Sequence, residues 1–153
     1  AGKVPALKHG DTTLFESAAI LTYLAEQFPD KGLIPQPGST QRAHFFQWMF
    51  YAMAELEQPL WTNAKHKFVL PKKLRIPEMK EVASYERKKA CTVVAQALKN
   101  QNYLINNQFS AADIMIGQTL LWGRMTGFES GYPALDEYMN RLKTREALGR
   151  ARG

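Results

Sequence analysis

The chain lacks the features of two broad classes of protein. It has 153 residues, only one cysteine, and no hydrophobic run of the roughly 18 residues that a membrane-spanning helix needs. A disulfide cannot form within the chain, which excludes a small disulfide-stapled domain and fits a cytoplasmic protein. Cys91 lies in the helical pattern KKACTVV, so we predict a small buried side chain, with a reactive thiol as the alternative.

The chain also lacks an uninterrupted block of one charge. It carries 20 Lys and Arg against 14 Asp and Glu, a net charge of +6 that could attract nucleic acid, a membrane surface or small anions. The densest basic stretch, KHKFVLPKKLR at residues 65–75, is broken by FVL and by Pro71. We interpret it as solvated surface, and we expect neither nucleic acid nor a membrane as a partner.

Metal-ligand spacing is absent as well. The three histidines, His9, His44 and His66, are scattered, and no two of them fall on one face of a helix. We therefore expect no metal site and no bound cofactor.

The first 29 residues combine short extended runs with one helix. Residues 3–8 (KVPALK) and 12–15 (TTLF) flank the turn signal HGD and predict a β-hairpin. Apolar residues at helical spacing then predict a helix over 17–27, which Pro29 ends. Two strands and one helix are marginal as a sheet domain, so we expect further strands before Ala1 or from another chain.

A linker rich in Pro and Gly, residues 30–38, separates this part from a region without strand patterns. We predict three units: 1–29, the linker 30–38, and an all-helical domain over 39–153. The fold class is an α+β fragment followed by an all-α domain, mostly α by residue count.

Four helices are predicted in the second unit. The first covers 39–58 with Ser39 or Thr40 as cap, is interrupted by Pro59 and resumes to about 69. The second covers 78–99, and the last covers 132–143 with Pro133 in its first turn. The third, SAADIMIGQTLLWGRM at 110–125, is apolar nearly all round, which is typical of the centre of a bundle, and Ser110 with Asp113 has the spacing of a capping box. We expect the inward face of the second helix to be Val82, Tyr85, Val93, Val94, Ala97 and Leu98.

The pair Glu16–Ser17 lies where the second strand meets the first helix. A helix N-terminus offers unpaired N–H groups and partial positive charge to a carboxylate, Ser17 adds a hydroxyl, and Glu16 adds a negative charge beside them. That combination suits a zwitterion with an ammonium and a carboxylate on one carbon. The alternative is ordinary helix entry, with Ser17 as cap and Glu16 favourable near the positive helix end.

The ordered set GKVPAL, LFESAAILTYLAEQF, GLIP, FSAADIMI and YPALDEYMNRLKTREAL resembles the cytosolic glutathione transferases across nearly the whole chain. The resemblance implies a thioredoxin-like first domain, of which residues 1–29 are the C-terminal β-β-α part, and the helical bundle of that family. It implies that the chain begins just before the third strand. The catalytic residue is then expected upstream of Ala1, so its identity is unknown and the chain alone is predicted to be inactive.

The same resemblance implies a glutathione site. Glu16 and Ser17 match the pair that grips the γ-glutamyl end, and the backbone of Val4, before a cis Pro5, matches the part that pairs with the cysteinyl unit. Lys3 is near enough to reach the glycine carboxylate. Glutathione is then a co-substrate rather than a bound cofactor.

Two further expectations follow from the resemblance. The substrate pocket for a small hydrophobic electrophile is lined in part by the long helix after the linker, to which Trp48, Tyr51 and Ala52 could contribute; the alternatives for these residues are packing and a dimer interface. A homodimer is expected, with the helices from residues 17 and 39 at its interface.

Three functions remain open from the sequence. The first is glutathione transfer to an electrophilic carbon or thiol–disulfide exchange. The second is a non-catalytic binding or interaction module on the same scaffold, because a fold does not fix a function. The third is a nucleic-acid partner, which would require steeply salt-dependent binding.

Overall fold

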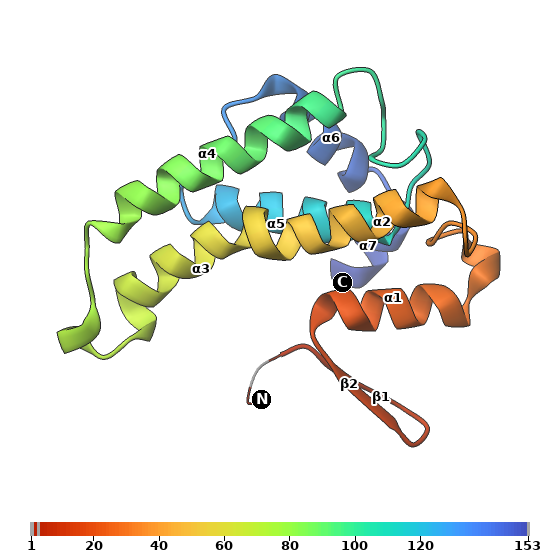
Figure 1. The fold of residues 1–153 in the computed structure, drawn as a ribbon, viewed down its shortest axis with the longest axis horizontal. Helices are drawn as coiled ribbons and strands as arrows, with labels where there is room; N and C mark the ends of the chain where they lie inside the picture. The colour runs from red at the N-terminus through yellow and green to blue at the C-terminus, as the bar shows by residue number, and fades with distance from the viewer. Residues whose placement is uncertain (1, 3, 153) are drawn as a thin grey trace.

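The computed structural model describes residues 2 and 4–152 and consists of a small hairpin–helix unit followed by a bundle of helices (Figure 1). Strands β1 (Ala6–His9) and β2 (Thr12–Phe15) pair antiparallel, with Ala6 opposite Phe15 and His9 opposite Thr12. Helix α1 (Ser17–Gln27) follows directly. The predicted hairpin and helix are thus confirmed, and so is the fold class, although the first strand covers Ala6–His9 rather than 3–8 and includes His9, which was expected in the turn.

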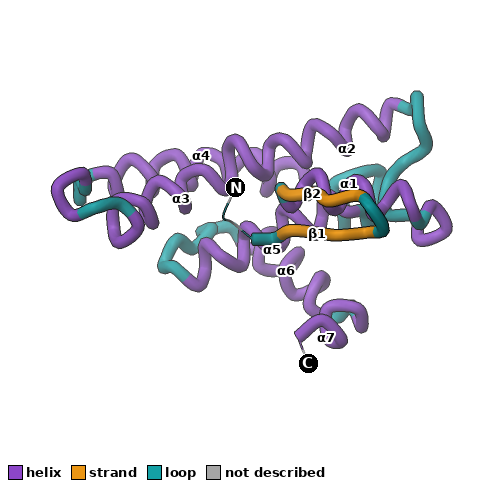
Figure 2. The backbone as a smooth tube through the Cα atoms, turned by 90° about the horizontal axis from the view of Figure 1, so that it is seen from below, coloured by secondary structure: helices purple, strands orange, loops and turns teal. Residues whose placement is uncertain are grey.

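The hairpin projects from the bundle, and α1 lies between the two (Figures 1 and 2). Helix α1 packs on one side against the hairpin and on the other against α5 (Ala111–Met125). Ile20 and Ala25 are its buried residues. The start of α1 therefore lies where β2 ends, at the end of the hairpin that is away from its turn.

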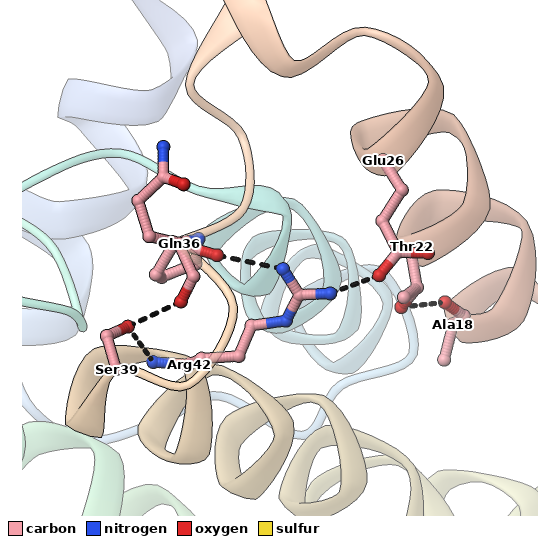
Figure 3. Close-up of polar contacts among 7 residues, drawn as sticks. Ala18, Thr22, Glu26, Gln36, Ser39 and Arg42 are labelled. Carbon is pink, nitrogen blue, oxygen red and sulfur yellow. Dashed lines mark hydrogen bonds and ion pairs between the residues drawn. The ribbon is translucent and has the colours of Figure 1, made fainter.

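One arginine fastens the linker to both units. The short helix η1 (Pro29–Lys31) lies at the start of the linker. Arg42 donates through Nη1 to the carbonyl oxygen of Pro35 at 2.8 Å, and through Nη2 to the carboxylate of Glu26 near the C-terminal end of α1 (Figure 3). Ser39 caps the next helix, because its Oγ accepts the N–H of Arg42 at 3.1 Å. The predicted Ser39 cap is confirmed.

The long helix after the linker is continuous but irregular. It runs through α2 (Thr40–Tyr51), the π-helical segment η2 (Ala52–Glu57), α3 (Gln58–Ala64) and a second π-helical segment, η3 (Lys65–Val69). Pro59 lies in the first turn of α3, directly after the π-helical segment η2, and it has no N–H to donate to the preceding turn. The helix therefore changes its winding at the predicted interruption rather than stopping.

The remaining helices complete the bundle. Helix α5 runs through its middle and is buried along much of its length, as its apolar sequence predicts (Figure 1). The other elements are η4 (Lys72–Leu74), α4 (Met79–Ala97), α6 (Pro133–Lys143) and α7 (Glu146–Arg152).

The predicted inward face of α4 was partly wrong. Val82, Tyr85 and Val93 are exposed, whereas Val94 and Leu98 are buried as expected. The buried stripe instead follows the small side chains Ala83, Ala90 and Cys91 and the long side chain of Arg87. The prediction followed the large apolar residues, but close packing of α4 against α3 selects the small ones. The burial of Cys91 is confirmed, and it raises the pKa of its thiol.

Arg87 is the largest fully buried side chain, with 2% of its surface exposed. Its Nη1 donates to the carbonyl oxygen of Leu56 in η2 at 2.7 Å, and its Nη2 to that of Thr119 in α5 at 3.2 Å. Burial lowers the pKa of this guanidinium. Gly123 leaves room for it, since a Cβ there would lie 2.5 Å from Nη2 of Arg87. Arg87 thus joins α4 to the π-helical segment and to the central helix.

The start of α5 is a closed polar cluster. Ser110 and Asp113 form the predicted capping box, with the carboxylate accepting the N–H of Ser110 at 2.8 Å. The same carboxylate accepts the N–H of Leu104 at 3.1 Å and the hydroxyl of Tyr138 at 2.8 Å. Burial raises the pKa of Asp113, and these donors oppose the rise. The box therefore ties α5 to the preceding loop and to α6.

Candidate functional site

The hairpin register brings the two predicted binding segments to one end of the sheet. Ala6 and Phe15 form the last rung, so Pro5 and Glu16 are the next residues on the two strands at the same end. The Val4–Pro5 peptide bond is cis, as predicted, and the side chain of Val4 is exposed. Lys3, the remaining residue of this set, lies outside the described residues.

The backbone of Glu16 is unusual. It has φ 71° and ψ 118°, a conformation that non-glycine residues rarely adopt. Among residues 2 and 4–152, the other non-glycine residues with positive φ are Asn106 and Asn107, and asparagine tolerates this region better. The sequence gives no sign of this feature, because glutamate is ordinary before a helix.

This backbone turns the chain from strand to helix. Glu16 is the N-cap residue of α1, and its carbonyl oxygen accepts the N–H of Ile20 at 3.0 Å. The first N–H groups of the helix have no carbonyl partner within it. Glu16 makes no side-chain cap, and Ser17 is the first helical residue rather than the cap that the alternative reading supposed.

The side chains of Glu16 and Ser17 make no hydrogen bond to the described residues. Within the part of the chain that the structure describes, neither the Glu16 carboxylate nor the Ser17 hydroxyl has a hydrogen-bond partner, and Glu16 is exposed. The N-terminal end of α1 thus carries main-chain donors, a hydroxyl and a carboxylate on adjacent residues. This set can hold a carboxylate at the helix end and an ammonium at Glu16.

A contact that the sequence did not indicate steadies the hairpin on α1. Nδ1 of His9, at the end of β1, lies 3.0 Å from the hydroxyl oxygen of Tyr23, and the two rings meet edge to face. Their separation of 14 residues hides the contact from any local pattern. It fixes the far end of the hairpin, whereas the end at Glu16 stays open.

Of the residues predicted for a substrate pocket, two are buried in the core and Tyr51 is half-buried against it. Trp48 and Ala52 are buried in the main hydrophobic core, and the ring of Trp48 meets that of Tyr51 edge to face. The hydroxyl of Tyr51 donates to the carbonyl oxygen of Ala90 at 3.2 Å, and burial first, then Glu55 and Cys91, raises the pKa of Tyr51 to about 12. These contacts match the packing alternative, and a role toward substrate stays a prediction.

Two hollows occur elsewhere on the molecule. An apolar cavity of about 450 Å³ lies between α5, α6 and α7, where a Cβ at Gly117 would collide with Leu142. A second, of about 390 Å³, lies beside the turn between α3 and α4. Neither hollow is lined by Trp48, Tyr51 or Ala52, the residues predicted for a substrate pocket.

Residues 2 and 4–152 contain no group of three or more His, Cys, Asp or Glu side chains placed to hold a metal ion. No helix in the same part of the chain is both long and apolar enough to cross a bilayer.

Two family profiles match the chain. Residues 46–146 match the profile described as glutathione S-transferase, C-terminal domain, and residues 1–26 match that described as glutathione S-transferase, N-terminal domain. The first match alone covers more than half of the chain.

Curated relatives of three kinds are similar to the chain. It is 31% identical over 140 residues to the disulfide-bond oxidoreductase YfcG of Escherichia coli, covering 91% of the chain and 63% of that protein. It is 30% identical over 146 residues to the glutathione S-transferase GST-4.5 of Xanthomonas campestris, covering 93% and 70%. It is 28% identical over 160 residues to elongation factor 1-gamma of Prunus avium, covering 97% and 36%. The chain thus spans only part of each relative.

Solved structures show the same arrangement of elements. A ternary complex of BphK, a bacterial glutathione S-transferase, superposes with a TM-score of 0.87 at 32% identity, over 98% of this chain and 72% of that one. A sphingomonad glutathione S-transferase complexed with glutathione gives 0.84 at 31% identity, with the same coverage. The hairpin, α1 and the helical bundle therefore follow a known two-part architecture.

Proposed function

Because the chain belongs to the glutathione S-transferase family, we propose that the N-terminal end of α1 binds the γ-glutamyl end of glutathione. The carboxylate of that group would lie at the first N–H groups of α1 and the hydroxyl of Ser17, and its ammonium at the carboxylate of Glu16. The backbone of Val4 would pair with the cysteinyl unit, and Lys3 would approach the glycine carboxylate. The sphingomonad relative, solved with glutathione, supports this choice of ligand.

The observation that carries the proposal is the backbone of Glu16. A residue with φ 71° costs stability, and such conformations cluster at binding sites, where they aim groups at a ligand. Here the strain leaves Glu16 and Ser17 without partners among the described residues, although Ser39 and Ser110 both cap their helices. A helix start that served only folding would gain from a cap.

The test is calorimetric titration of the chain with reduced glutathione. We expect Glu16→Ala and Ser17→Ala each to weaken binding by roughly 10- to 100-fold, the value of a charge-assisted hydrogen bond. Glu16→Gly separates the contribution of the Glu16 carboxylate from that of the backbone conformation, since glycine keeps the φ of 71° but removes the carboxylate. Binding by Glu16→Gly at the original affinity would reject the ionic role of Glu16.

A matched control comes from the hairpin. Asp11→Asn removes an exposed charge from the turn between the strands, far from the start of α1, and should leave the affinity unchanged. If Asp11→Asn weakens binding as much as Glu16→Ala, general electrostatics rather than a built site would explain the effect.

The proposed reaction is attack of the glutathione thiolate on an electrophilic carbon, or thiol–disulfide exchange, as the name of the Escherichia coli relative indicates for that protein. In this proposal the residues named above hold the peptide, and none of them is assigned to lower the pKa of the thiol. We therefore predict that the 153-residue chain binds glutathione but does not conjugate a model electrophile. Conjugation at a rate typical of the family would overturn this prediction.

A non-catalytic module is the second candidate. The similarity to elongation factor 1-gamma supports it, because that protein carries a related region as about a third of its length. Loss of glutathione binding is the expected property of a module that kept only the scaffold, so the same titration separates the two candidates.

The remaining assignments are proposals of the same kind. The units 1–29, 30–38 and 39–153, the homodimer, the cytoplasmic location and a small hydrophobic electrophile rest on the family. For the dimer, the exposed ring of Phe50 on the long helix from residue 39 offers an apolar contact. Sedimentation at micromolar concentration tests it, and a monomer would refute it.

A further inference from the structure

The turn between α3 and α4 combines positive charge with exposed apolar side chains. Residues 65–77, KHKFVLPKKLRIP, contain five Lys and Arg and no Asp or Glu. We name this segment the basic apolar tip. It forms one end of the long axis of the molecule, whereas the linker between α1 and α2 lies at the other end (Figure 1).

The apolar side chains of the tip face solvent. Between 52% and 62% of the surface of each of four residues is exposed: Phe68, Val69, Leu74 and Ile76. Single exposed apolar residues are common, but four within nine residues of one turn concentrate exposed apolar surface there, and such concentrations mark interaction surfaces. The solvated-surface interpretation of residues 65–75 explains the charges but not these side chains.

The tip is held in shape by its own polar groups. Arg75 donates through Nε to the carbonyl oxygen of Leu70 at 2.7 Å and through Nη2 to that of Phe68 at 2.8 Å. Nδ1 of His66 accepts the N–H of Ile76 at 3.0 Å. These bonds join the end of the long helix to the approach to α4, so the exposed side chains are presented by an ordered turn.

A hollow opens beside the tip. Its volume is about 390 Å³, and three cationic side chains line it, Lys67, Arg75 and Lys80. No carboxylate lies among its lining residues, which otherwise are Asn63, His66, Pro77, Thr126 and Phe128. Its size and charge suit an anionic head group next to the apolar side chains.

We propose that the basic apolar tip docks on the surface of a bilayer that contains anionic phospholipid. The apolar side chains would enter the boundary between head groups and acyl chains, and the lysines would lie against the phosphates. An apolar anchor or a basic patch alone gives only weak, reversible attachment, whereas the two together hold a protein on a membrane. This inference does not depend on the proposed glutathione site, which lies on the hairpin–helix unit.

The apolar content favours a membrane over a nucleic acid. Proteins that bind single strands use aromatic rings for stacking, and duplex readers use polar side chains at the bases and phosphates. Of the four exposed apolar residues of the tip, three are aliphatic. Aliphatic side chains gain from leaving water for an acyl layer but offer a nucleic acid no stacking surface.

The test is sedimentation of the full chain with vesicles of phosphatidylcholine, with and without 30% phosphatidylglycerol. We expect binding to the anionic vesicles and weaker binding in 0.5 M salt, because salt screens the charges. Each cation contributes roughly fivefold in affinity, so Lys72→Gln with Lys73→Gln should weaken binding by about 25-fold. Phe68→Ser should weaken it by roughly tenfold without changing the charge.

The matched control removes the same charge elsewhere. Lys88→Gln with Lys89→Gln lies on exposed positions of α4 and should weaken binding by less than about threefold. Far-UV circular dichroism checks that each variant is folded, and unchanged glutathione titration separates this test from that of the proposed function. Equal binding to neutral and anionic vesicles, equal loss in the control, or binding to a DNA duplex in place of vesicles would each overturn the proposal.

Discussion

The starts of α1 and α5 are built on opposite plans. At α5, Ser110 and Asp113 are buried, and the carboxylate accepts hydrogen bonds from a hydroxyl and from main-chain N–H groups of two segments. At α1, Glu16 is exposed, strained, and without a partner among the described residues. The first arrangement satisfies the helix end internally, and the second leaves it open.

The difference separates two uses of the same chemistry. Both sites set an acid and a serine at a helix N-terminus, where unpaired N–H groups attract negative charge. The closed site stabilises the fold because every polar group is already paired. The open site keeps its donors and its acceptor for a partner from solution.

The sharpest test of this comparison is Asp113→Ala. The substitution leaves the buried N–H groups of Leu104 and Ser110 without an acceptor and leaves the Tyr138 hydroxyl only its longer bond to the main-chain oxygen of residue 113, so we expect a loss of about 3–5 kcal/mol in the free energy of unfolding. Urea denaturation measures it. Asp136→Ala removes an exposed acid from the first turn of α6 and should cost less than about 0.5 kcal/mol. Equal effects of the two would contradict the structural role of the box.

The second test concerns the join between the two regions. Arg42→Ala breaks the bonds to Pro35 and Glu26, and because Glu26 is half exposed we expect a modest loss of about 1–2 kcal/mol. The same denaturation measures it. Lys31→Ala removes an ion pair with Asp30 that is exposed on both sides and should change stability by less than about 0.3 kcal/mol. A loss no greater than that of the control would mean that Arg42 does not fasten the regions.

The third test should increase the stability of the fold instead of lowering it. Glu16→Gly should raise the free energy of unfolding by about 1 kcal/mol, because glycine adopts φ 71° without strain. Thermal unfolding without ligand measures the gain. Glu16→Ala, which keeps the strain, should show no gain. A loss of stability in Glu16→Gly would show that the open helix start serves folding after all.

The smallest expected effect is that of Ser17→Ala. Its hydroxyl has no partner among residues 2 and 4–152, so stability should change by less than about 0.5 kcal/mol. The equivalent change at the closed site, Ser110→Ala, should cost more, because Oγ of Ser110 lies 3.2 Å from the Asp113 carboxylate. Similar losses at the two serines would remove the distinction between the helix starts.

Local patterns predicted the elements but not the packing of every face. Turn signals and apolar spacing were enough for the hairpin, α1 and the start of α5, because neighbours in sequence determine each of them. The face of α4 was misassigned, since burial of Arg87 depends on the main-chain carbonyls of Leu56 and Thr119, more than 30 residues away on either side.

The candidate site was predicted in part. Residue types and the family resemblance singled out Glu16 and Ser17, but the positive φ of Glu16 follows from the geometry by which the hairpin joins α1, which no residue type signals. Trp48 and Ala52 were considered for a pocket because aromatic and small residues occur in both pockets and cores. Only the packing of α2 and η2 against α5 distinguishes these environments.

The π-helical segment η2 has a consequence for insertions and deletions. A π-turn holds one residue more than the α-helical turn that it replaces. Deleting one residue within Ala52–Glu57 should therefore let this segment wind as ordinary α-helix, whereas the same deletion within α3 would rotate everything after it by about 100° about the helix axis. The basic apolar tip should keep its orientation after the first deletion and lose it after the second.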